Sequence, residues 1–333
     1  APGAPLVWDD AKGNVCFDWH LGDAARTDAG FAGAAHVVKI DLTNSRLAPN
    51  AIEPRAANGH YDTATDQYTL YTTSQNPHLI RLFMAGEFGF SEDKIRIIAP
   101  DVGGGFGVKI MHYPEEVIAS WASRKLNRPV QWTEWRTDFH QSMSHGNERW
   151  FLDTEVAVMA DGTMTGFRSR ALDDAGAYLR YEPLGGVIWS QVAPGMYGWR
   201  NLRLDFTQVM TNKAPCSPNR GYSRMQHLWF TERIIDIVAH ELGFDRVELR
   251  RKNYVQPEQM PYETPNGCVY DSGDYPRALE AVLELIGYES VEERRADAAS
   301  RGKLLGFGIG STLDSGTNNF GQSQLLNPDL QFS

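Results

Sequence analysis

A glycine-rich stretch interrupted by one aromatic residue is the part of this sequence best suited to chemistry. The segment GGGFG, residues 103–107, follows an apolar run, Lys94 to Pro100, that predicts a strand. Glycines let backbone N–H groups approach an anion closely, so the loop could hold a phosphate, although a purely structural turn is the alternative. Its spacing is neither G-x-G-x-x-G nor G-K-[ST], which disfavours a Rossmann or Walker site. Turn geometry alone would not select Phe106, so we expect its ring to lie beside a ligand.

Cysteine and histidine spacing argues against a metal site built from this chain alone. The three cysteines, Cys16, Cys216 and Cys268, lie far apart and form no C-x-x-C pair. These thiolates alone therefore cannot build an iron–sulfur cluster or a structural zinc site. The histidines are scattered, without H-E-x-x-H or paired spacing. We expect any redox centre that serves this chain to lie elsewhere.

Hydrophobic periodicity predicts an α+β or mixed α/β fold around the glycine loop. Alternation in the first forty residues and between Trp132 and Asp205 predicts strands, with Asp161-Gly162 as a hairpin turn. Periodicity near 3.6, with prolines at helix starts and glycines after helix ends, predicts helices. These cover residues 77–88, 114–127, 226–242, 275–286 and 290–300. The apolar segment LLGFGIGSTL, residues 304–313, predicts the opening strand of a further unit.

Composition predicts an acidic, soluble globular protein. Of 333 residues, 42% are apolar and 22% are charged, with a net charge of -10. No Lys/Arg block stands out, which argues against binding to nucleic acid or anionic membranes. No apolar run could span a bilayer and no signal peptide is recognisable, so we expect a cytoplasmic protein without a membrane span. Because the first residue is Ala, we expect a processed chain, a split subunit or an excised segment.

Seven segments occur in the order found in the molybdenum hydroxylases, the xanthine oxidase family. They are GDAARTDAGFAGAAHVVKIDL, AIEPRAA, YTTSQNPHLIRLFMA, GGGFGVK followed by YPEE, RPVQWTEWR, PNRGYSR and ERIIDIVAHELGFDRVELRRKN. The chain therefore resembles the molybdopterin-binding large subunits of this family, in particular the group of aerobic carbon monoxide dehydrogenase. The resemblance implies a first molybdopterin-binding domain at residues 1–256, a connecting helical segment at 257–302 and the incomplete start of a second molybdopterin-binding domain at 303–333.

The resemblance also implies roles for individual residues. Gln75 matches a glutamine whose amide points at an oxo group of the molybdenum, so the chain supplies no direct metal ligand. An arginine beside cofactor and substrate is matched by Arg220, and Ile110 and Tyr222 would line the substrate pocket. The loop against the metal and the pterin corresponds to Gly104, Gly105, Phe106 and Gly107. An amide can donate to an oxo group without acting as an anionic ligand, and a guanidinium is a permanent planar donor.

Departures from the relatives narrow the expected chemistry. Carbon monoxide-oxidising members carry a copper-bridging cysteine where this chain reads Arg220-Gly221-Tyr222, so we expect no carbon monoxide oxidation. Purine-oxidising members carry a glutamate where this chain has Ile110, which favours an aldehyde, an aromatic N-heterocycle or a methylated purine. The general-base glutamate of the family is expected beyond Ser333, so no catalytic residue is assigned within the chain.

The resemblance implies an oxidoreductase that hydroxylates an aldehyde or an aromatic N-heterocycle with water as oxygen source. We expect activity only in a larger assembly. The implied cofactor is molybdenum–molybdopterin in its cytosine dinucleotide form, and the implied partners are an iron–sulfur subunit with 2Fe–2S clusters, an FAD subunit and the remainder of the large subunit. The alternatives are a non-catalytic cofactor-binding scaffold and a periplasmic molybdenum aldehyde dehydrogenase.

Overall fold

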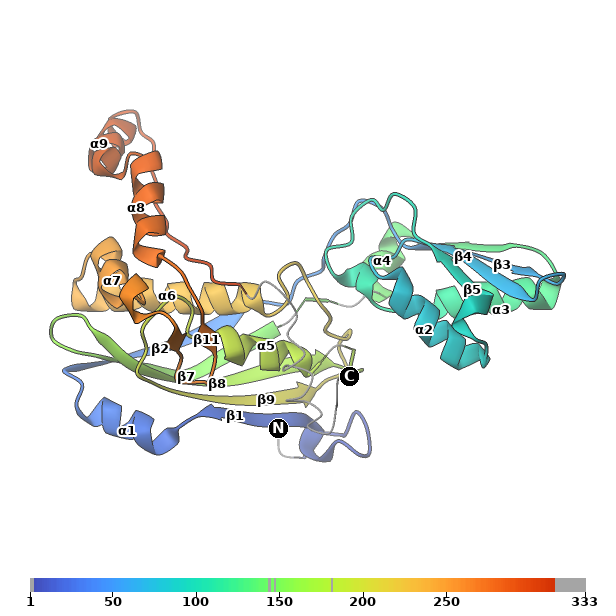
Figure 1. Cartoon of the computed structure of the whole chain (residues 1–333), viewed down its shortest axis with the longest axis horizontal. Coiled ribbons are helices and arrows are strands. Elements are labelled where there is room, and N and C mark those ends of the chain that lie inside the picture. Colours follow the sequence, from blue (N-terminus) through green and yellow to red (C-terminus); the bar gives the residue numbers. More distant parts are fainter. Residues whose placement is uncertain (1–2, 143–144, 147, 181, 315–333) are drawn as a thin grey trace.

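Two lobes, each with its own β-sheet, make up the described part of the chain (Figure 1). The computed structural model describes residues 3–142, 145–146, 148–180 and 182–314. The larger lobe holds a five-stranded sheet in the order β1-β9-β8-β7-β2, and the smaller lobe holds a four-stranded sheet in the order β5-β4-β3-β6. Both sheets combine parallel and antiparallel pairs, which confirms the predicted mixed α/β fold.

The larger lobe buries its core between the five-stranded sheet and two helices. The helices are α5 (Leu184–Val192) and α6 (Arg224–Leu242). Rings from strand and helix pack together, with Phe151 centred 4.2 Å from Phe230 and 5.5 Å from Trp189. The strands are β1 (Val15–Gly22), β2 (His36–Asn44), β7 (Glu148–Val158), β8 (Met164–Gly176) and β9 (Asn201–Met210).

The predicted hairpin at Asp161-Gly162 is confirmed by the pairing of β7 with β8. Gly162 has φ +86°, a conformation that glycine adopts without strain. The Asp161 carboxylate accepts a hydrogen bond of 3.0 Å from the Thr163 N–H, as turn aspartates commonly do. Local sequence therefore fixes this turn.

Several elements differ from the sequence prediction. The helix α1 (Ala24–Ala32) interrupts the strand region of the first forty residues, and the helices α4 (Arg136–Ser142) and α5 interrupt the predicted strand region between Trp132 and Asp205. A Cβ on Gly186 of α5 would lie 2.3 Å from the Phe206 ring. Gly185 and Gly186 look like turn residues in the sequence, but in α5 they allow the helix to pack closely on the sheet. The predicted strand at 304–313 is wrong, because residues 303–314 form no regular element. Phe307, Ile309 and Leu313 of this segment pack on the larger core, while Leu304 is fully exposed.

The smaller lobe has a separate core and begins its helices as predicted. Proline occupies the first turn of α2 (Pro77–Phe88) and of α3 (Pro114–Leu126), and Gly89 ends α2 with φ +65°. Tyr68, Leu70, Ile80 and Met84 are among the buried residues of this core. The other elements are β3 (Ala56–Asp62), β4 (Gln67–Thr72), β5 (Ile95–Ile98), β6 (Val130–Thr133) and α4 (Arg136–Ser142).

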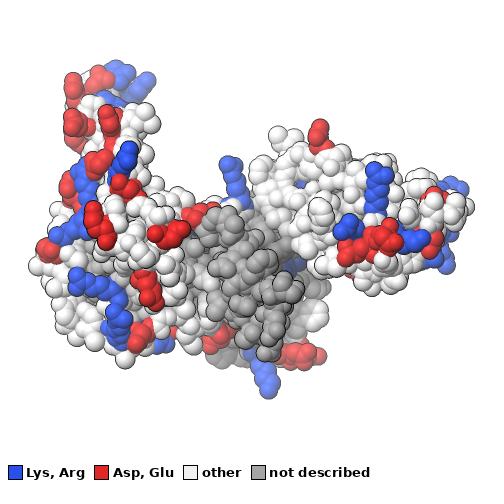
Figure 2. All heavy atoms as spheres, viewed as in Figure 1, with Lys and Arg blue, Asp and Glu red and all other residues white. Residues whose placement is uncertain are grey.

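The C-terminal helices extend from the larger lobe. Tyr275, Leu279 and Leu283 of α8 bury their side chains in the larger core. Figure 2 shows acidic and basic side chains mixed over this arm. Over the described ranges every helix is too short or too polar to cross a membrane. The elements are α7 (Arg246–Asn253), β10 (Tyr262–Glu263), β11 (Val269–Tyr270), α8 (Tyr275–Leu285) and α9 (Val291–Ser300).

A buried ion pair fastens α7 to α6. The Arg250 guanidinium is fully buried and donates to Glu232 at 2.7 Å and to Asp236 at 3.0 Å. Glu232 also accepts a hydrogen bond of 2.6 Å from the Tyr197 hydroxyl. Burial raises the pKa of Glu232, while Arg250 opposes that rise. The carboxylate therefore depends on this arginine for its charge.

We expect Arg250→Ala to lower the free energy of unfolding by about 3 kcal/mol, because it leaves the Glu232 carboxylate buried without its cation. Arg251→Ala is the matched control, since Arg251 pairs with Glu280 at the surface and should cost less than about 1 kcal/mol. Thermal unfolding of both variants checks this, and equal effects would contradict it.

Candidate functional site

The glycine loop lies where the smaller lobe faces the larger one, after strand β5 (Figure 1). Gly104 and Gly107 have φ +90° and +103°, values that favour glycine. Phe106 also has a positive φ, +54°, which is uncommon for a bulky side chain. Its ring turns back over Gly104, where a Cβ would lie 3.0 Å from the ring. Such a conformation persists only when contacts outside the loop hold it.

Gln75 holds the loop from the smaller lobe. Its side-chain Oε1 accepts a hydrogen bond of 2.9 Å from the Gly107 N–H. Its backbone N–H donates to the Lys109 carbonyl at 2.9 Å. A Cβ on Gly105 would lie 2.2 Å from the same Oε1, so a side chain there would displace the Gln75 amide. Because an N–H can only donate, the amide must place its oxygen on the loop. The NH₂ end of Gln75 is thereby left as the donor.

A turn of the larger lobe, residues 218–223, holds the loop from the other side. The Arg220 N–H donates to the Phe106 carbonyl at 2.9 Å. A Cβ on Gly107 would lie 2.1 Å from the Pro218 carbonyl oxygen. Within the turn, Tyr222 and Ser223 have φ +26° and +57°. Two strained backbone segments therefore lie against each other.

The loop and the turn line a cavity of ≈ 350 Å³ that is open to solvent. Known small-molecule sites measure about 300 to 1,000 Å³. Gly104 and Gly105 lie behind the cavity wall and pack against the Phe106 ring and the Gln75 amide. The structure thus brings the predicted site residues together, and their roles stay predictions. The lining residues are Gln75, Phe106, Gly107, Ile110, Pro218, Asn219, Arg220, Gly221, Tyr222, Arg224 and Asp314.

The Tyr222 side chain points from this turn toward buried acidic groups. Its hydroxyl donates to Glu182 at 3.3 Å. Glu182 also accepts from Gln208 at 3.0 Å, and Gln208 donates to Asp173 at 3.0 Å. Burial raises the pKa of Tyr222 well above its ordinary value, and the nearby Glu182 adds to the rise. Tyr222 therefore stays a neutral hydroxyl at physiological pH.

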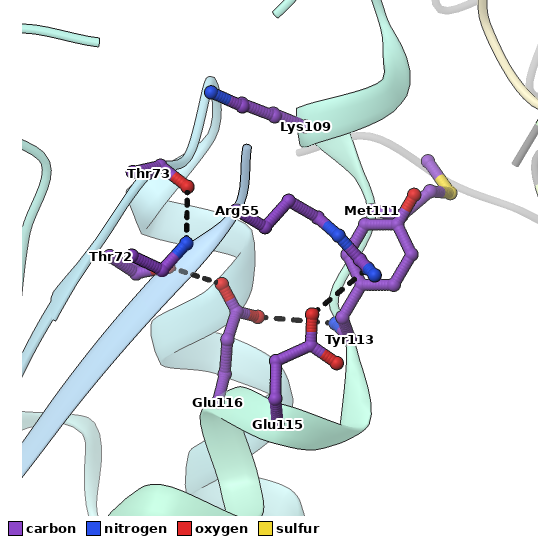
Figure 3. Close-up of a pocket in the computed structure, with 9 residues that line it drawn as sticks. Arg55, Thr72, Thr73, Lys109, Met111, Tyr113, Glu115 and Glu116 are labelled. Atoms are coloured by element: carbon purple, nitrogen blue, oxygen red, sulfur yellow. Dashed lines mark hydrogen bonds and ion pairs between the residues drawn. The ribbon is translucent and has the colours of Figure 1, made fainter. Parts of the chain in front are cut away.

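A buried group of charges surrounds Arg55, in a pocket that Lys109 also lines (Figure 3). The Arg55 guanidinium lies 3.7 Å from the centre of the Tyr113 ring and pairs with Glu115 at 2.9 Å. Glu134 pairs with the same guanidinium at 2.7 Å. The cation stacks on an aromatic face while two carboxylates neutralise it, which offsets the cost of burial.

Glu115 and Glu116, two carboxylates in the first turn of α3, complement the helix dipole and also make contacts outside the helix. Glu115 pairs with Arg55, and the buried Glu116 accepts from the Thr72 hydroxyl at 2.7 Å and from the Tyr113 N–H at 3.2 Å. Both lie at the start of α3, as predicted. The Tyr113 N–H is a local partner, the N-cap of a capping box, whereas Arg55 and Thr72 come from segments that sequence spacing cannot reveal.

Sequence reasoning gave no role to Glu53, Lys109 or Glu182, which support the loop and the turn. The first two lie in segments AIEPRAA and GGGFGVK, and the charge of Lys109 beside the glycines was an available signal. Glu182 lies in no motif, and only tertiary structure brings it to Tyr222.

Residues 7–254 match the molybdopterin cofactor-binding domain family. The chain is 34% identical over 330 residues to the carbon monoxide dehydrogenase large chain of Hydrogenophaga pseudoflava, covering 92% of this chain and 41% of that one. It is 31% identical over 301 residues to the nicotine 6-hydroxylase large subunit of Paenarthrobacter nicotinovorans, covering 89% of this chain and 36% of that one. The solved quinoline 2-oxidoreductase of Pseudomonas putida 86 has a TM-score of 0.80 at 30% identity, covering 87% and 37%. The chain spans well under half the length of each relative.

We expect Gly107→Ala to lower the free energy of unfolding by about 3 kcal/mol, because the new methyl group meets the Pro218 carbonyl and the positive φ adds strain. Gly89→Ala is the matched control: its φ is also positive, but nothing lies within 4 Å of the added carbon. It should cost only about 1 kcal/mol. Urea unfolding measures both, and a Gly107→Ala protein as stable as the control would contradict the packing described here.

Proposed function

The chain belongs to the molybdopterin cofactor-binding domain family of the molybdenum hydroxylases, and from this premise we propose that it forms the cofactor-holding part of an oxidoreductase active site. One observation carries the proposal. Gln75 and Phe106 of the smaller lobe and Arg220 of the larger lobe line one cavity. The Gln75 amide and the Arg220 guanidinium can donate hydrogen bonds to a polar, anionic cofactor.

The residues around the cavity fit a molybdenum–molybdopterin group. The NH₂ end of Gln75 can donate to an oxo group without competing as an anionic ligand. Glycine backbone near Phe106 allows close approach to a flat pterin ring system, and the guanidinium of Arg220 is exposed and can donate to a phosphate or substrate oxygen. When bound, the molybdenum centre supplies a two-electron oxidation coupled to transfer of oxygen from water.

The residues of this chain would bind and orient rather than move the key proton. Among the described lining residues Asp314 is the one carboxylate, and its oxygen pairs with Arg224 at 2.5 Å. Tyr222 stays protonated and can only donate or accept a hydrogen bond. We propose that the general base is a glutamate supplied by the remainder of the large subunit, beyond Ser333.

The apolar wall at Ile110 favours an aldehyde or an aromatic N-heterocycle as substrate. An apolar side chain cannot pair with the polar edge of a purine, and leaving that edge unpaired weakens binding. Two relatives are named as a nicotine 6-hydroxylase and a quinoline 2-oxidoreductase, which supports an aromatic N-heterocycle as the proposed substrate.

Carbon monoxide oxidation is not the proposed reaction, although a carbon monoxide dehydrogenase chain is among the relatives. Gly221 cannot ligate copper. Cys216 is fully buried, and its thiol donates to the Asp174 carbonyl at 2.8 Å, outside the cavity lining. Burial also raises the pKa of Cys216, so its metal-binding thiolate is disfavoured.

The proposed assembly contains an iron–sulfur subunit with 2Fe–2S clusters, an FAD subunit and the rest of the large subunit. We propose the cytosine dinucleotide form of the pterin and a cytoplasmic location. A scaffold without catalysis is the second candidate, favoured by the lack of an uncommitted carboxylate among the described lining residues. Hydroxylase activity of the purified assembly, lost when one glutamate beyond Ser333 is replaced, would exclude the scaffold.

We expect Arg220→Ala to lower kcat/KM of the assembled enzyme by about ten- to a hundredfold, because a charge-assisted hydrogen bond to cofactor or substrate is lost. Arg170→Ala is the control, since Arg170 is exposed and pairs with Asp153 away from the cavity. Molybdenum content measured beside the kinetics separates cofactor loss from slower turnover. Unchanged kinetics would remove Arg220 from the site.

Gln75→Glu tests the amide donor separately from the loop. The glutamate retains an oxygen for the Gly107 N–H but lacks the NH₂ donor, so we expect kcat to fall at least about tenfold with little loss of stability. Steady-state kinetics and thermal unfolding of the same preparation measure the two effects. Wild-type turnover in Gln75→Glu would show that the amide donor is not used.

A further inference from the structure

One carboxylate joins the two ends of the glycine loop. Glu53 Oε2 accepts a hydrogen bond of 2.7 Å from the Gly103 N–H and one of 2.8 Å from Lys109 Nζ. The Glu53 N–H also donates to the Gly103 carbonyl at 3.2 Å. The Glu53 side chain therefore joins Gly103 to Lys109, and Phe106 and Gly107 lie between these two residues in the sequence.

The Lys109 ammonium has little access to water. Its side chain is 0% exposed, whereas that of Glu53 is 36% exposed. Burial lowers the pKa of Lys109, and Glu53 partly opposes this change. Burial acts to raise the pKa of Glu53, but the hydrogen bonds from Lys109 and Gly103 hold it below its usual value. The pair is therefore charged, and each partner depends on the other.

Neighbouring charges are already committed to different partners. Glu134 and Glu115 pair with Arg55, and Arg136 donates to the Ala51 carbonyl at 2.8 Å. Glu53 is thus the carboxylate that contacts the Lys109 ammonium among the described residues.

Lys109 also connects this ion pair to the cavity wall. Its carbonyl accepts the Gln75 N–H at 2.9 Å, and Gln75 in turn accepts the Gly107 N–H. A displacement of Lys109 would therefore move both the amide of Gln75 and the loop that it contacts. Gly103 adds a steric limit, because a Cβ there would lie 2.6 Å from Glu53 Cβ.

We propose that the Glu53–Lys109 pair is a positioning device that presets the glycine loop, and with it Phe106, Gly107 and the Gln75 amide, in the conformation that receives the cofactor. The pair lies outside the cavity lining and touches neither substrate nor cofactor in this role. The inference rests on the proposed function for the identity of the ligand, while the loop conformation itself can be tested without any ligand.

The test compares four variants of the complete assembled protein with the wild type: Glu53→Gln, Lys109→Met, the double variant and Glu92→Gln. The last is the matched control, because Glu92 pairs with Arg81 at 2.9 Å in the same lobe, away from the loop. Hydrogen exchange of a peptide covering residues 103–109 reports loop opening. Molybdenum content per chain and the separate values of kcat and KM report the cofactor site.

We expect Glu53→Gln to speed exchange of the loop about tenfold or more, because the Lys109 ammonium is left buried without its counter-charge. Molybdenum content should fall in the same variant, while Glu92→Gln matches the wild type in both readouts. The double variant should exchange more slowly than Glu53→Gln, since it removes the unpaired buried cation. Rescue of this kind would not follow from a general loss of stability.

Wild-type exchange in both Glu53→Gln and Lys109→Met would overturn the proposal, as would faster exchange with undiminished molybdenum. A wild-type assembly without molybdenum would instead contradict the proposed function, and the exchange measurements would still decide whether the pair orders the loop. If Lys109→Met fails to fold, Glu53→Gln and its comparison with Glu92→Gln suffice for the decision.

Discussion

The close contact between two backbones, the glycine loop of the smaller lobe and the turn of the larger lobe, is the constraint on which this structure depends. The Arg220 N–H reaches the Phe106 carbonyl, and Gly107 approaches the Pro218 carbonyl at a distance that excludes any Cβ. Side chains would keep the two backbones apart. Glycine at 107 is therefore a condition for forming the cavity as well as for the local conformation.

Both backbones are held in uncommon conformations, and buried polar groups stabilise each of them. On one side Phe106 has a positive φ, and the Glu53–Lys109 ion pair holds Gly103 and Lys109 at the two ends of its loop. On the other side Tyr222 has a positive φ, and its hydroxyl contacts Glu182. Strained backbone persists where the surrounding structure over-determines it, and such sites are common where a protein must be preorganised for a ligand.

In the proposed assembly, this chain would bind the cofactor and another segment would supply the proton-transfer group. The described residues offer donors, a planar cation and an apolar wall, which under the proposed function would orient a cofactor. They do not offer an uncommitted carboxylate at the cavity, because Asp314 is paired with Arg224. Under the proposed function, a site that binds through one segment and takes its proton-transfer group from another would be active only when both are assembled.

Sequence by itself determined the mixed fold, the proline-started helices, the hairpin at Asp161-Gly162 and the family, because these depend on local periodicity, turn chemistry and ordered motifs. It also indicated Gln75, Phe106 and Arg220, but only through resemblance. Tertiary structure alone decided that α5 is a helix, that residues 304–313 form no strand, and that Glu53 joins Gly103 to Lys109. These features depend on which groups meet across the fold, and neither hydrophobic periodicity nor residue spacing encodes the partner of a buried charge.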